Sequence, residues 1–154
     1  IFAGRVVEDF KLFTGTFVQV GPLRTDAIAA ASPVVHDALV TGQDRPYIGL
    51  LAWPNLHACR QLMNDPNASF EAAVKHPAVV ACLKKGLEAH NTAANGASSL
   101  RIARAMLMVE PPSIDGNEIT DKGYINQRAA LERRAALVER LYANRPDDDV
   151  IVMT

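Results

Sequence analysis

The sequence predicts an α+β fold in which a small, mostly antiparallel sheet is flanked by helices and preceded by an N-terminal β-hairpin. Three observations lead to this fold class. Short runs rich in β-branched residues alternate with apolar stripes of helical period. Glycine or proline stands at most of the boundaries between them. A chain of 154 residues is also long enough to bury a core of its own. We therefore expect residues 1–154 to form one domain.

The predicted hairpin lies within residues 4–24. Two short extended runs meet at Thr14-Gly15-Thr16, where glycine accommodates a positive φ angle. The second run stops before Pro22, and proline at a first helical position predicts that a helix begins there. That helix should end at Ser32-Pro33, because the residue before a proline avoids the helical region.

Two strands and three helices are expected next. Residues 34–41 and 47–53 have strand composition, and the turn between them is short enough to favour antiparallel pairing. One helix follows Asn55, and a second runs from Ser69, a capping residue, to Lys75. The third and longest begins at Pro77 and carries an apolar stripe. The expected stripe consists of Val80, Leu83, Leu87, His90 and Ala94.

Residues 102–109 have strand composition again, and residues 118–128, EITDKGYINQR, form the second informative stretch. Here a turn is centred on Lys122, and Asn126 is a good cap for the final helix. We expect that helix to run without interruption to Asn144, where Asn and the following proline indicate a stop. On the residues alone, Lys122 is a solvated turn lysine, as most lysines are.

Composition argues against several classes of function. The 16 Lys and Arg against 17 Asp and Glu give a net charge of -1, so bulk electrostatics favours neither nucleic acid nor a membrane surface. No apolar run approaches the roughly 18 residues of a membrane span. Cys59 and Cys82 stand among apolar residues, which is typical of reduced thiols in a cytoplasmic protein. No Cys or His grouping has zinc-ligand spacing, so we expect no metal site.

The stretch GRVVEDFKLFTGTFVQVGPLR, residues 4–24, resembles the hinge motif of the adenylate-forming superfamily. This superfamily includes acyl-CoA synthetases, luciferases and peptide-synthetase adenylation domains. The residues that carry the resemblance are Gly4, Arg5, Asp9, Gly15 and Pro22. Within the superfamily the stretch is most similar to feruloyl-CoA synthases. Because the chain starts inside this motif and lacks an initiator Met, we expect it to be the C-terminal piece of a longer protein.

The resemblance implies a mobile C-terminal lid of an AMP-forming acid–CoA ligase. Such an enzyme adenylates a carboxylate, here a hydroxycinnamate or another aromatic acid, using ATP and Mg2+, and then makes a thioester with CoA. The implied catalytic residue is Lys122, which would reach the carboxylate and the α-phosphate. In an ungapped register, however, the family's lysine falls on Tyr124. We favour Lys122, because a turn can re-aim a flexible side chain. Arg5 would lie near the bound nucleotide.

The same resemblance implies a hinge at Val7 and Glu8. The family usually has Asp or Lys where this chain has Val7, so the pivot should centre on Glu8 or Asp9. Thr14 and Gly15 would line the channel for CoA, since a residue without a side chain leaves room for the pantetheine arm.

The implied partners are the protein's own N-terminal domain, a small-molecule acid, ATP and CoA. That missing domain would hold the ATP and acyl sites, so the isolated 154 residues should bind no cofactor tightly and should be inactive. Two other functions remain open. The chain is alternatively a stand-alone α+β binding or dimerisation module, or the lid of an adenylating enzyme that loads a carrier protein.

Overall fold

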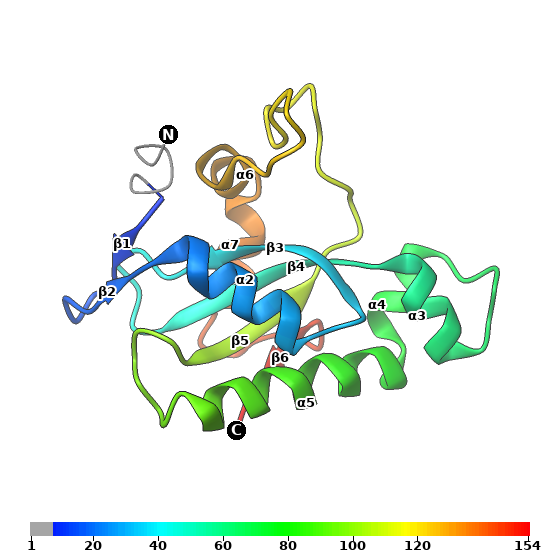
Figure 1. The fold of residues 1–154 in the computed structure, drawn as a ribbon, viewed down its shortest axis with the longest axis horizontal. Coiled ribbons are helices and arrows are strands. Elements are labelled where there is room, and N and C mark those ends of the chain that lie inside the picture. The colour runs from blue at the N-terminus through cyan, green and yellow to red at the C-terminus, as the bar shows by residue number, and fades with distance from the viewer. Residues whose placement is uncertain (1–7) are drawn as a thin grey trace.

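The computed structural model describes residues 8–154, which form a two-stranded hairpin, a four-stranded sheet and the helices around it (Figure 1). The order along the chain is β1 (Phe10–Lys11), β2 (Phe17–Val18), α2 (Val20–Ala30), β3 (Val35–Thr41), β4 (Ile48–Pro54), α3 (Leu56–Met63), α4 (Phe70–Lys75), α5 (Pro77–Ala93), β5 (Ile102–Leu107), α6 (Gln127–Arg133), α7 (Ala135–Leu141) and β6 (Val150–Val152). The predicted α+β class and the N-terminal hairpin are both confirmed.

The four-stranded sheet has the order β3-β4-β5-β6. Its first and last pairs are antiparallel, as expected for a mostly antiparallel sheet, whereas β4 and β5 are parallel. A parallel pair needs a long crossover connection, and α3, α4 and α5 supply it. Every residue of β4 is buried, because helices cover both faces of the sheet.

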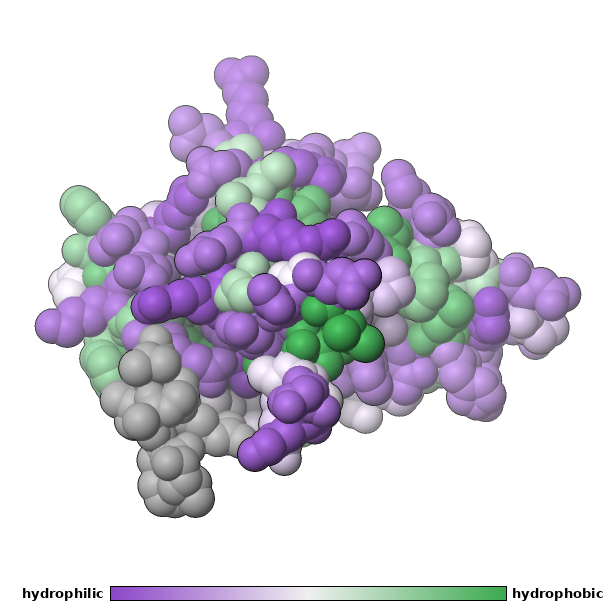
Figure 2. Space-filling view, turned by 90° about the horizontal axis from the view of Figure 1, so that it is seen from above, coloured by the Kyte–Doolittle hydropathy of each residue, from purple (hydrophilic) through white to green (hydrophobic). Residues whose placement is uncertain are grey.

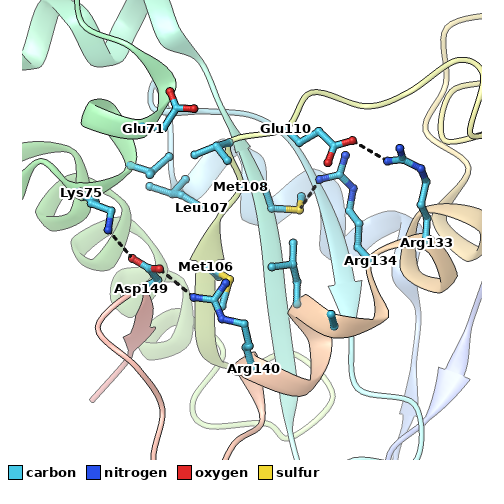
Figure 3. A pocket seen from close by; sticks show the side chains of 14 residues that line it. Glu71, Lys75, Met106, Leu107, Met108, Glu110, Arg133, Arg134, Arg140 and Asp149 are labelled. Carbon is cyan, nitrogen blue, oxygen red and sulfur yellow. Dashed lines mark hydrogen bonds and ion pairs between the residues drawn. The ribbon is translucent and has the colours of Figure 1, made fainter.

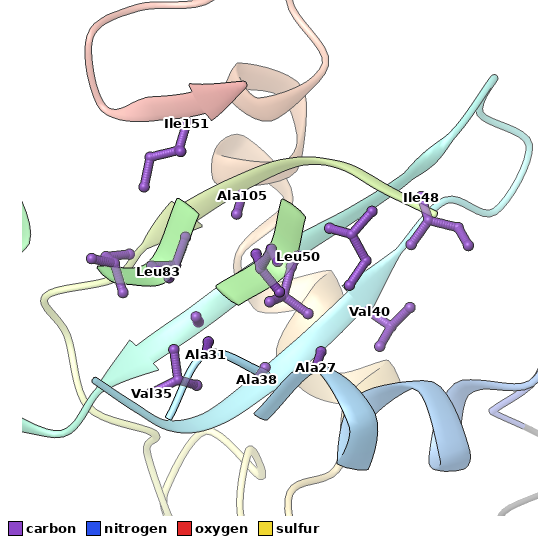
Figure 4. Close-up of a cluster of buried hydrophobic side chains, with 14 of the residues drawn as sticks. Ala27, Ala31, Val35, Ala38, Val40, Ile48, Leu50, Leu83, Ala105 and Ile151 are labelled. Carbon is purple, nitrogen blue, oxygen red and sulfur yellow. The ribbon is translucent and has the colours of Figure 1, made fainter. Parts of the chain in front are cut away.

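Two apolar cores lie on the two faces of the sheet. One is formed with α2 and α5, and Figure 4 shows side chains such as Ala27, Leu50 and Leu83 meeting there. The other is formed with α6 and α7 and includes Leu51 and Leu141. Adjacent residues of β4 thus pack into the cores on opposite faces of the sheet, as the alternation of side chains along a strand requires. Burial of each leucine contributes about 1.5–3 kcal/mol to stability.

Three sequence predictions about the helices are wrong in detail. Helix α2 begins at Val20 and not at Pro22, because the Asp9 carboxylate accepts a hydrogen bond from the Val20 amide at 2.9 Å and serves as an N-terminal cap. The predicted final helix is divided at Arg134 into α6 and α7. The buried stripe of α5 is rotated from the expected one, and its members are Val79, Leu83, Leu87 and Asn91.

The rotation of α5 follows from a polar contact at its end. Asn91 is buried, and its side-chain amide donates to the Ile102 carbonyl and accepts from the Ile102 amide, both at 2.8 Å. This pair fixes the start of β5 against α5. The short strand β6 was not predicted from the sequence at all.

Cys59 is buried and Cys82 is partly buried, and both are free thiols, as predicted. Burial raises the pKa of the Cys59 thiol above its ordinary value. Among the helices of residues 8–154, none has the length and apolar character needed to cross a bilayer. The same residues contain no group of three or more His, Cys, Asp or Glu side chains that fits a metal ion.

Candidate functional site

Two turns carry the residues that the sequence singled out, and they project from different parts of the molecule. The β1–β2 turn lies at one end of the domain, whereas the loop with Lys122 extends beyond α6 (Figure 1). Figure 2 views the molecule from the side of that loop, and most of this face is hydrophilic. The chain therefore presents two separate turns to its surroundings.

The β1–β2 turn is a tight glycine turn, as predicted. Gly15 has a φ angle of +91°, and its amide donates to the Leu12 carbonyl at 2.8 Å. The Thr14 and Thr16 hydroxyl oxygens lie 3.1 Å apart across the turn. A Cβ atom added at Gly15 would find no heavy atom within 4 Å. The space over Gly15 is therefore open.

Two exposed aromatic residues flank Gly15. Phe13 is 78% exposed and Phe17 is 52% exposed, which is unusual for such large apolar side chains. The Phe13 amide donates to the Arg45 carbonyl at 2.8 Å and ties the hairpin to the β3–β4 turn. The turn thus combines a glycine that has open space above it with two exposed aromatic side chains beside it.

The predicted hinge is described only from Glu8 onward, since Val7 and Arg5 lie outside the described residues. Asp9 caps α2 through the Val20 amide, and Phe10 already pairs with β2, so Asp9 is part of the domain body. The two positions left open from the sequence are therefore not equivalent. Asp9 bonds to a helix amide, whereas Glu8 pairs with the side chain of Arg24.

Glu8 is held to the domain by Arg24. The Arg24 guanidinium donates to the Glu8 carboxylate at 2.9 Å and to the Gln127 side-chain carbonyl at 3.2 Å. Gln127 in turn bonds both the amide and the carbonyl of Val40 on the edge strand β3. Glu8 is thereby connected to the first residue of α6.

Lys122 lies in a second tight turn, as predicted. The Thr120 amide donates to the Tyr124 carbonyl at 2.8 Å, and the Gly123 amide donates back to the Thr120 carbonyl at 2.9 Å. Gly123 has a φ angle of +84°. Lys122 and Tyr124 both expose their side chains. Asn126 then caps α6 through the Ala129 amide at 3.2 Å, which the sequence also predicted.

The turn is attached to the domain through Glu118, which is fully buried. Arg134 donates to the two Glu118 carboxylate oxygens at 2.6 and 3.0 Å, and the Ser113 amide donates to one of them at 2.8 Å. Burial raises the pKa of Glu118, but the hydrogen bonds from Arg134 and Ser113, together with the Arg134 charge, outweigh it and lower that pKa. Glu118 is therefore a carboxylate at neutral pH.

Arg134 also reaches the start of the same loop. Its guanidinium carbon lies 5.1 Å from the Trp53 ring centroid, and its second terminal nitrogen donates to the Pro111 carbonyl at 3.1 Å. The Trp53 indole donates to the Glu110 carbonyl at 2.9 Å. Arg134 is only 5% exposed, so it belongs to the interior of the domain and not to a solvated helix face.

A groove of about 610 Å³ is lined in part by Arg134 (Figure 3). Methionine and leucine side chains of β5 and α7 form its apolar floor. Ion pairs stand at its rim: Arg133 with Glu110 at 2.9 Å, and Asp149 with Lys75 at 3.8 Å and with Arg140 at 2.9 Å. Each of these five charged groups has a partner of opposite charge within the protein.

Sequence reasoning missed four residues of these networks: Glu8's partner Arg24, and Gln127, Glu118 and Arg134. An acidic residue just before a turn and a pair of arginines on the following helix are visible in the sequence. Their burial is not, because Glu118 and Arg134 become neighbours only when the loop folds back onto the sheet.

Comparisons with known proteins identify the family and the fold. Residues 11–146 match the sequence model of the AMP-binding enzyme C-terminal domain. The adenylation domain of a carboxylic acid reductase from Segniliparus rugosus, solved with AMP and a co-purified carboxylic acid, is 21% identical with a TM-score of 0.67. That match covers 90% of this chain and 20% of the other. Comparison with curated proteins gave no match.

Two further solved structures have the same fold. The adenylation domain of a carboxylate reductase from Mycobacterium chelonae is 21% identical with a TM-score of 0.69, over 91% of this chain and 20% of that one. The A-PCP didomain of the Segniliparus rugosus enzyme, in complex with AMP, is 22% identical with a TM-score of 0.64, over 88% and 17%. This chain therefore spans about a fifth of the length of each structure.

Proposed function

The chain belongs to the C-terminal domain family of AMP-binding enzymes, and on that premise we propose that residues 1–154 are the mobile lid of an AMP-forming acid–CoA ligase. The proposed substrates are ATP with Mg2+, an aromatic acid such as a hydroxycinnamate, and CoA. The resemblance of residues 4–24 to feruloyl-CoA synthases supports the acid and the thiol. The proposed location is cytoplasmic, and the proposed partner is the N-terminal domain of the same protein.

The observation that carries the proposal is that one domain body presents two turns of opposite chemistry. One turn exposes Lys122 on a fixed base, and the other exposes Gly15 with open space above it. A lid that alternates between two orientations needs a different surface for each. The two turns supply a cationic surface and a narrow uncharged one.

The first half-reaction needs the cation. A carboxylate oxygen attacks the α-phosphorus of ATP, a new C–O–P linkage forms, and pyrophosphate leaves. Both reactants are anions and repel each other, so a lysine ammonium between them lowers the barrier by stabilising the charge that gathers on the phosphorus centre. In this proposal Lys122 is that lysine, and its exposed position on a tight turn allows it to reach into a partner domain.

The second half-reaction needs space. The thiol sulfur attacks the acyl carbon of the acyl-adenylate, a thioester forms, and AMP leaves with the bonding electron pair. The thiol arrives on a pantetheine arm, which requires a narrow apolar path. Gly15 leaves that path open, and the exposed rings of Phe13 and Phe17 offer apolar walls.

A carrier protein is the second candidate for the thiol partner. All three similar structures belong to carboxylic acid reductases, and one is a didomain that includes a PCP, a carrier-protein domain. A carrier protein delivers the same pantetheine arm as CoA. The hairpin would serve both partners in the same way.

The test uses the full-length protein that contains this domain. It is incubated with ATP, Mg2+ and a panel of aromatic and aliphatic acids, and pyrophosphate release is followed. CoA or a pantetheine-loaded carrier protein is then added, and thioester is measured by mass spectrometry. Acid-dependent pyrophosphate release followed by acyl-CoA supports the ligase. Acylated carrier without acyl-CoA favours the second candidate, and no pyrophosphate with any acid contradicts both.

A further inference from the structure

The loop between β5 and α6 has an unusual attachment for a segment without regular secondary structure. Lys122 lies near its end, and the loop spans residues 108–126. A loop of this length gains little order from its own turns, because ordering each backbone residue costs conformational entropy. Something in the domain body must therefore determine where the Lys122 turn lies.

Arg134 contacts both halves of this loop. Near the start, it donates to the Pro111 carbonyl at 3.1 Å and packs on Trp53, whose indole nitrogen holds the Glu110 carbonyl. Further along, it makes a bidentate ion pair with Glu118. One guanidinium thus joins two points of the loop to the sheet.

Glu118 extends the attachment to the Lys122 turn. Its own carbonyl accepts the Asn126 amide at 2.8 Å, directly beyond the turn, and its own amide donates to the Ser113 carbonyl at 2.9 Å. Ile119 and Ile125 form an isolated bridge one residue further out. Lys122 therefore stands at the tip of a short ladder whose base is the buried carboxylate.

The helical segment that carries Arg134 is interrupted at this ion pair. Arg134 has φ and ψ angles of -105° and 27°, and α6 ends before it while α7 begins after it. A solvated arginine would not require such a break. A buried ion pair is often replaceable by apolar residues without loss of stability, so stability alone does not account for it.

We propose that Glu118 and Arg134 are positioning residues for the adenylation step, holding the Lys122 turn at a fixed place relative to the sheet. This inference rests on the proposed function, because it assumes that Lys122 acts in the first half-reaction. In this proposal the pair contacts no substrate and acts only through the turn. An error of about 1 Å in the place of an aimed group is enough to lower a rate about 100-fold.

The test compares Glu118→Gln, the apolar double variant Glu118→Leu/Arg134→Met, and Arg140→Gln as a control in the full-length protein. Arg140 is a matched control, because it lies on the neighbouring helix α7 and pairs with two carboxylates. Two rates are measured below the melting temperature: acid-dependent pyrophosphate release, and thioester formation from synthetic acyl-adenylate. Amide exchange at Thr120, Gly123 and Asn126 reports the order of the turn.

We expect Glu118→Gln to lower pyrophosphate release at least about tenfold and to speed exchange in the turn by a similar factor. Thioester formation should change less than about twofold, as should both rates in Arg140→Gln. The apolar double variant should recover the melting temperature but not the pyrophosphate rate. If the pair only stabilised the fold, recovery of the melting temperature would be accompanied by recovery of the pyrophosphate rate.

Two outcomes overturn the inference. One is unchanged exchange in the turn when Glu118 is replaced. The other is a parallel fall of both half-reactions together with the melting temperature. Two failures of the premise have separate signatures. If the proposed function is wrong, the unmodified protein releases no pyrophosphate with any acid, and if only the role of Lys122 is wrong, Lys122→Ala leaves pyrophosphate release unchanged even though Glu118→Gln still loosens the turn.

Discussion

The β1–β2 turn and the Lys122 turn have similar local structures but different attachments. Each is built on a glycine with positive φ, Gly15 at +91° and Gly123 at +84°, and each glycine has open space where a Cβ would stand. Behind the Lys122 turn lies the buried ion pair of Glu118 and Arg134. Outside its own strands, the tip of the hairpin contacts the Arg45 carbonyl and the Ser98 hydroxyl.

This difference matches what each turn would have to do. A channel wall works through the absence of a side chain, so small displacements of Gly15 change little. A lysine that must lie between two anions works through distance, since the energy of two unit charges varies inversely with their separation. Under the proposed function, the turn with the stricter geometric task is the turn with the buried anchor.

The largest expected effect comes from Lys122→Ala in the full-length protein. Acid-dependent pyrophosphate release should fall by ~10²–10³, the scale for losing one aimed electrostatic group. Thioester formation from synthetic acyl-adenylate should be spared. The matched variant is Tyr124→Phe, which removes only a hydroxyl from the same exposed turn. If Tyr124→Phe produces this pattern and Lys122→Ala does not, the ungapped register is right and Tyr124 stands at the position of the family's lysine.

The second-largest effects are expected from leucine substitutions at the two turn glycines, each of which should slow a different half-reaction. Gly15→Leu and Gly123→Leu both place a side chain at positive φ, where the strain costs about 1 kcal/mol, and at both positions an added Cβ atom has no heavy atom within 4 Å. Stability should therefore fall equally, which thermal melts can verify. Gly15→Leu should slow thiol transfer at least about tenfold and leave pyrophosphate release nearly normal, because only the pantetheine arm must pass that turn.

Gly123→Leu should show the opposite split, because it disturbs the Lys122 turn and leaves the hairpin open. Both half-reactions are measured on one preparation of each variant. Equal losses of both half-reactions in both variants would mean that the turns have no separate roles. The comparison between them would then describe packing alone.

Most of the local structure could be predicted from the sequence, because it depends on residues that are close together in the chain. The glycine turn at Gly15, the cap at Asn126 and the antiparallel pairing of β3 with β4 all follow from short-range chemistry. Lys122 could likewise be placed in a turn. These features need no knowledge of the rest of the fold.

The missed features all depend on contacts that are distant along the chain. The start of α2 depends on Asp9, which lies 11 residues before the amide that it caps. The break at Arg134 depends on Glu118, 16 residues away. Nothing in the helical pattern around Arg134 distinguishes it from a solvent-exposed arginine. Its burial becomes visible only once Trp53 and the loop are brought to the same face of the sheet.

Acid should affect the two turns differently. The lowered pKa of Glu118 means that its contribution to stability is complete above the ordinary glutamate pKa of about 4.3 and is lost as the pH falls below it. Residues 13–17 at the tip of the hairpin contain no titratable side chain. Below about pH 4, exchange should therefore quicken in the Lys122 turn more than in the hairpin, after correction for intrinsic rates.

The control for this effect of low pH is Glu118→Gln, because the glutamine side chain cannot ionise. In that variant the free energy of unfolding from urea titrations should depend less steeply on pH below about 4.3 than in the unmodified protein. Asp147→Asn tests specificity, because the pKa of Asp147 is also lowered, by its hydrogen bond with Arg140, but this residue lies on the surface. An unchanged slope in Glu118→Gln would refute the role of this carboxylate.

The smallest expected effects compare one outer contact of each turn. Asn126→Ala removes the side chain that caps α6 directly beyond the Lys122 turn, and loss of such a cap costs about 1 kcal/mol. Ser98→Ala removes a hydroxyl 3.4 Å from the Thr16 hydroxyl, an exposed contact whose loss should cost less than about 0.5 kcal/mol. Urea unfolding of both variants measures the difference.

A cost for Ser98→Ala equal to that of Asn126→Ala would mean that the hairpin tip is anchored from outside as firmly as the Lys122 turn. The assignment of a strict geometric task to only one of them would then lose its structural basis.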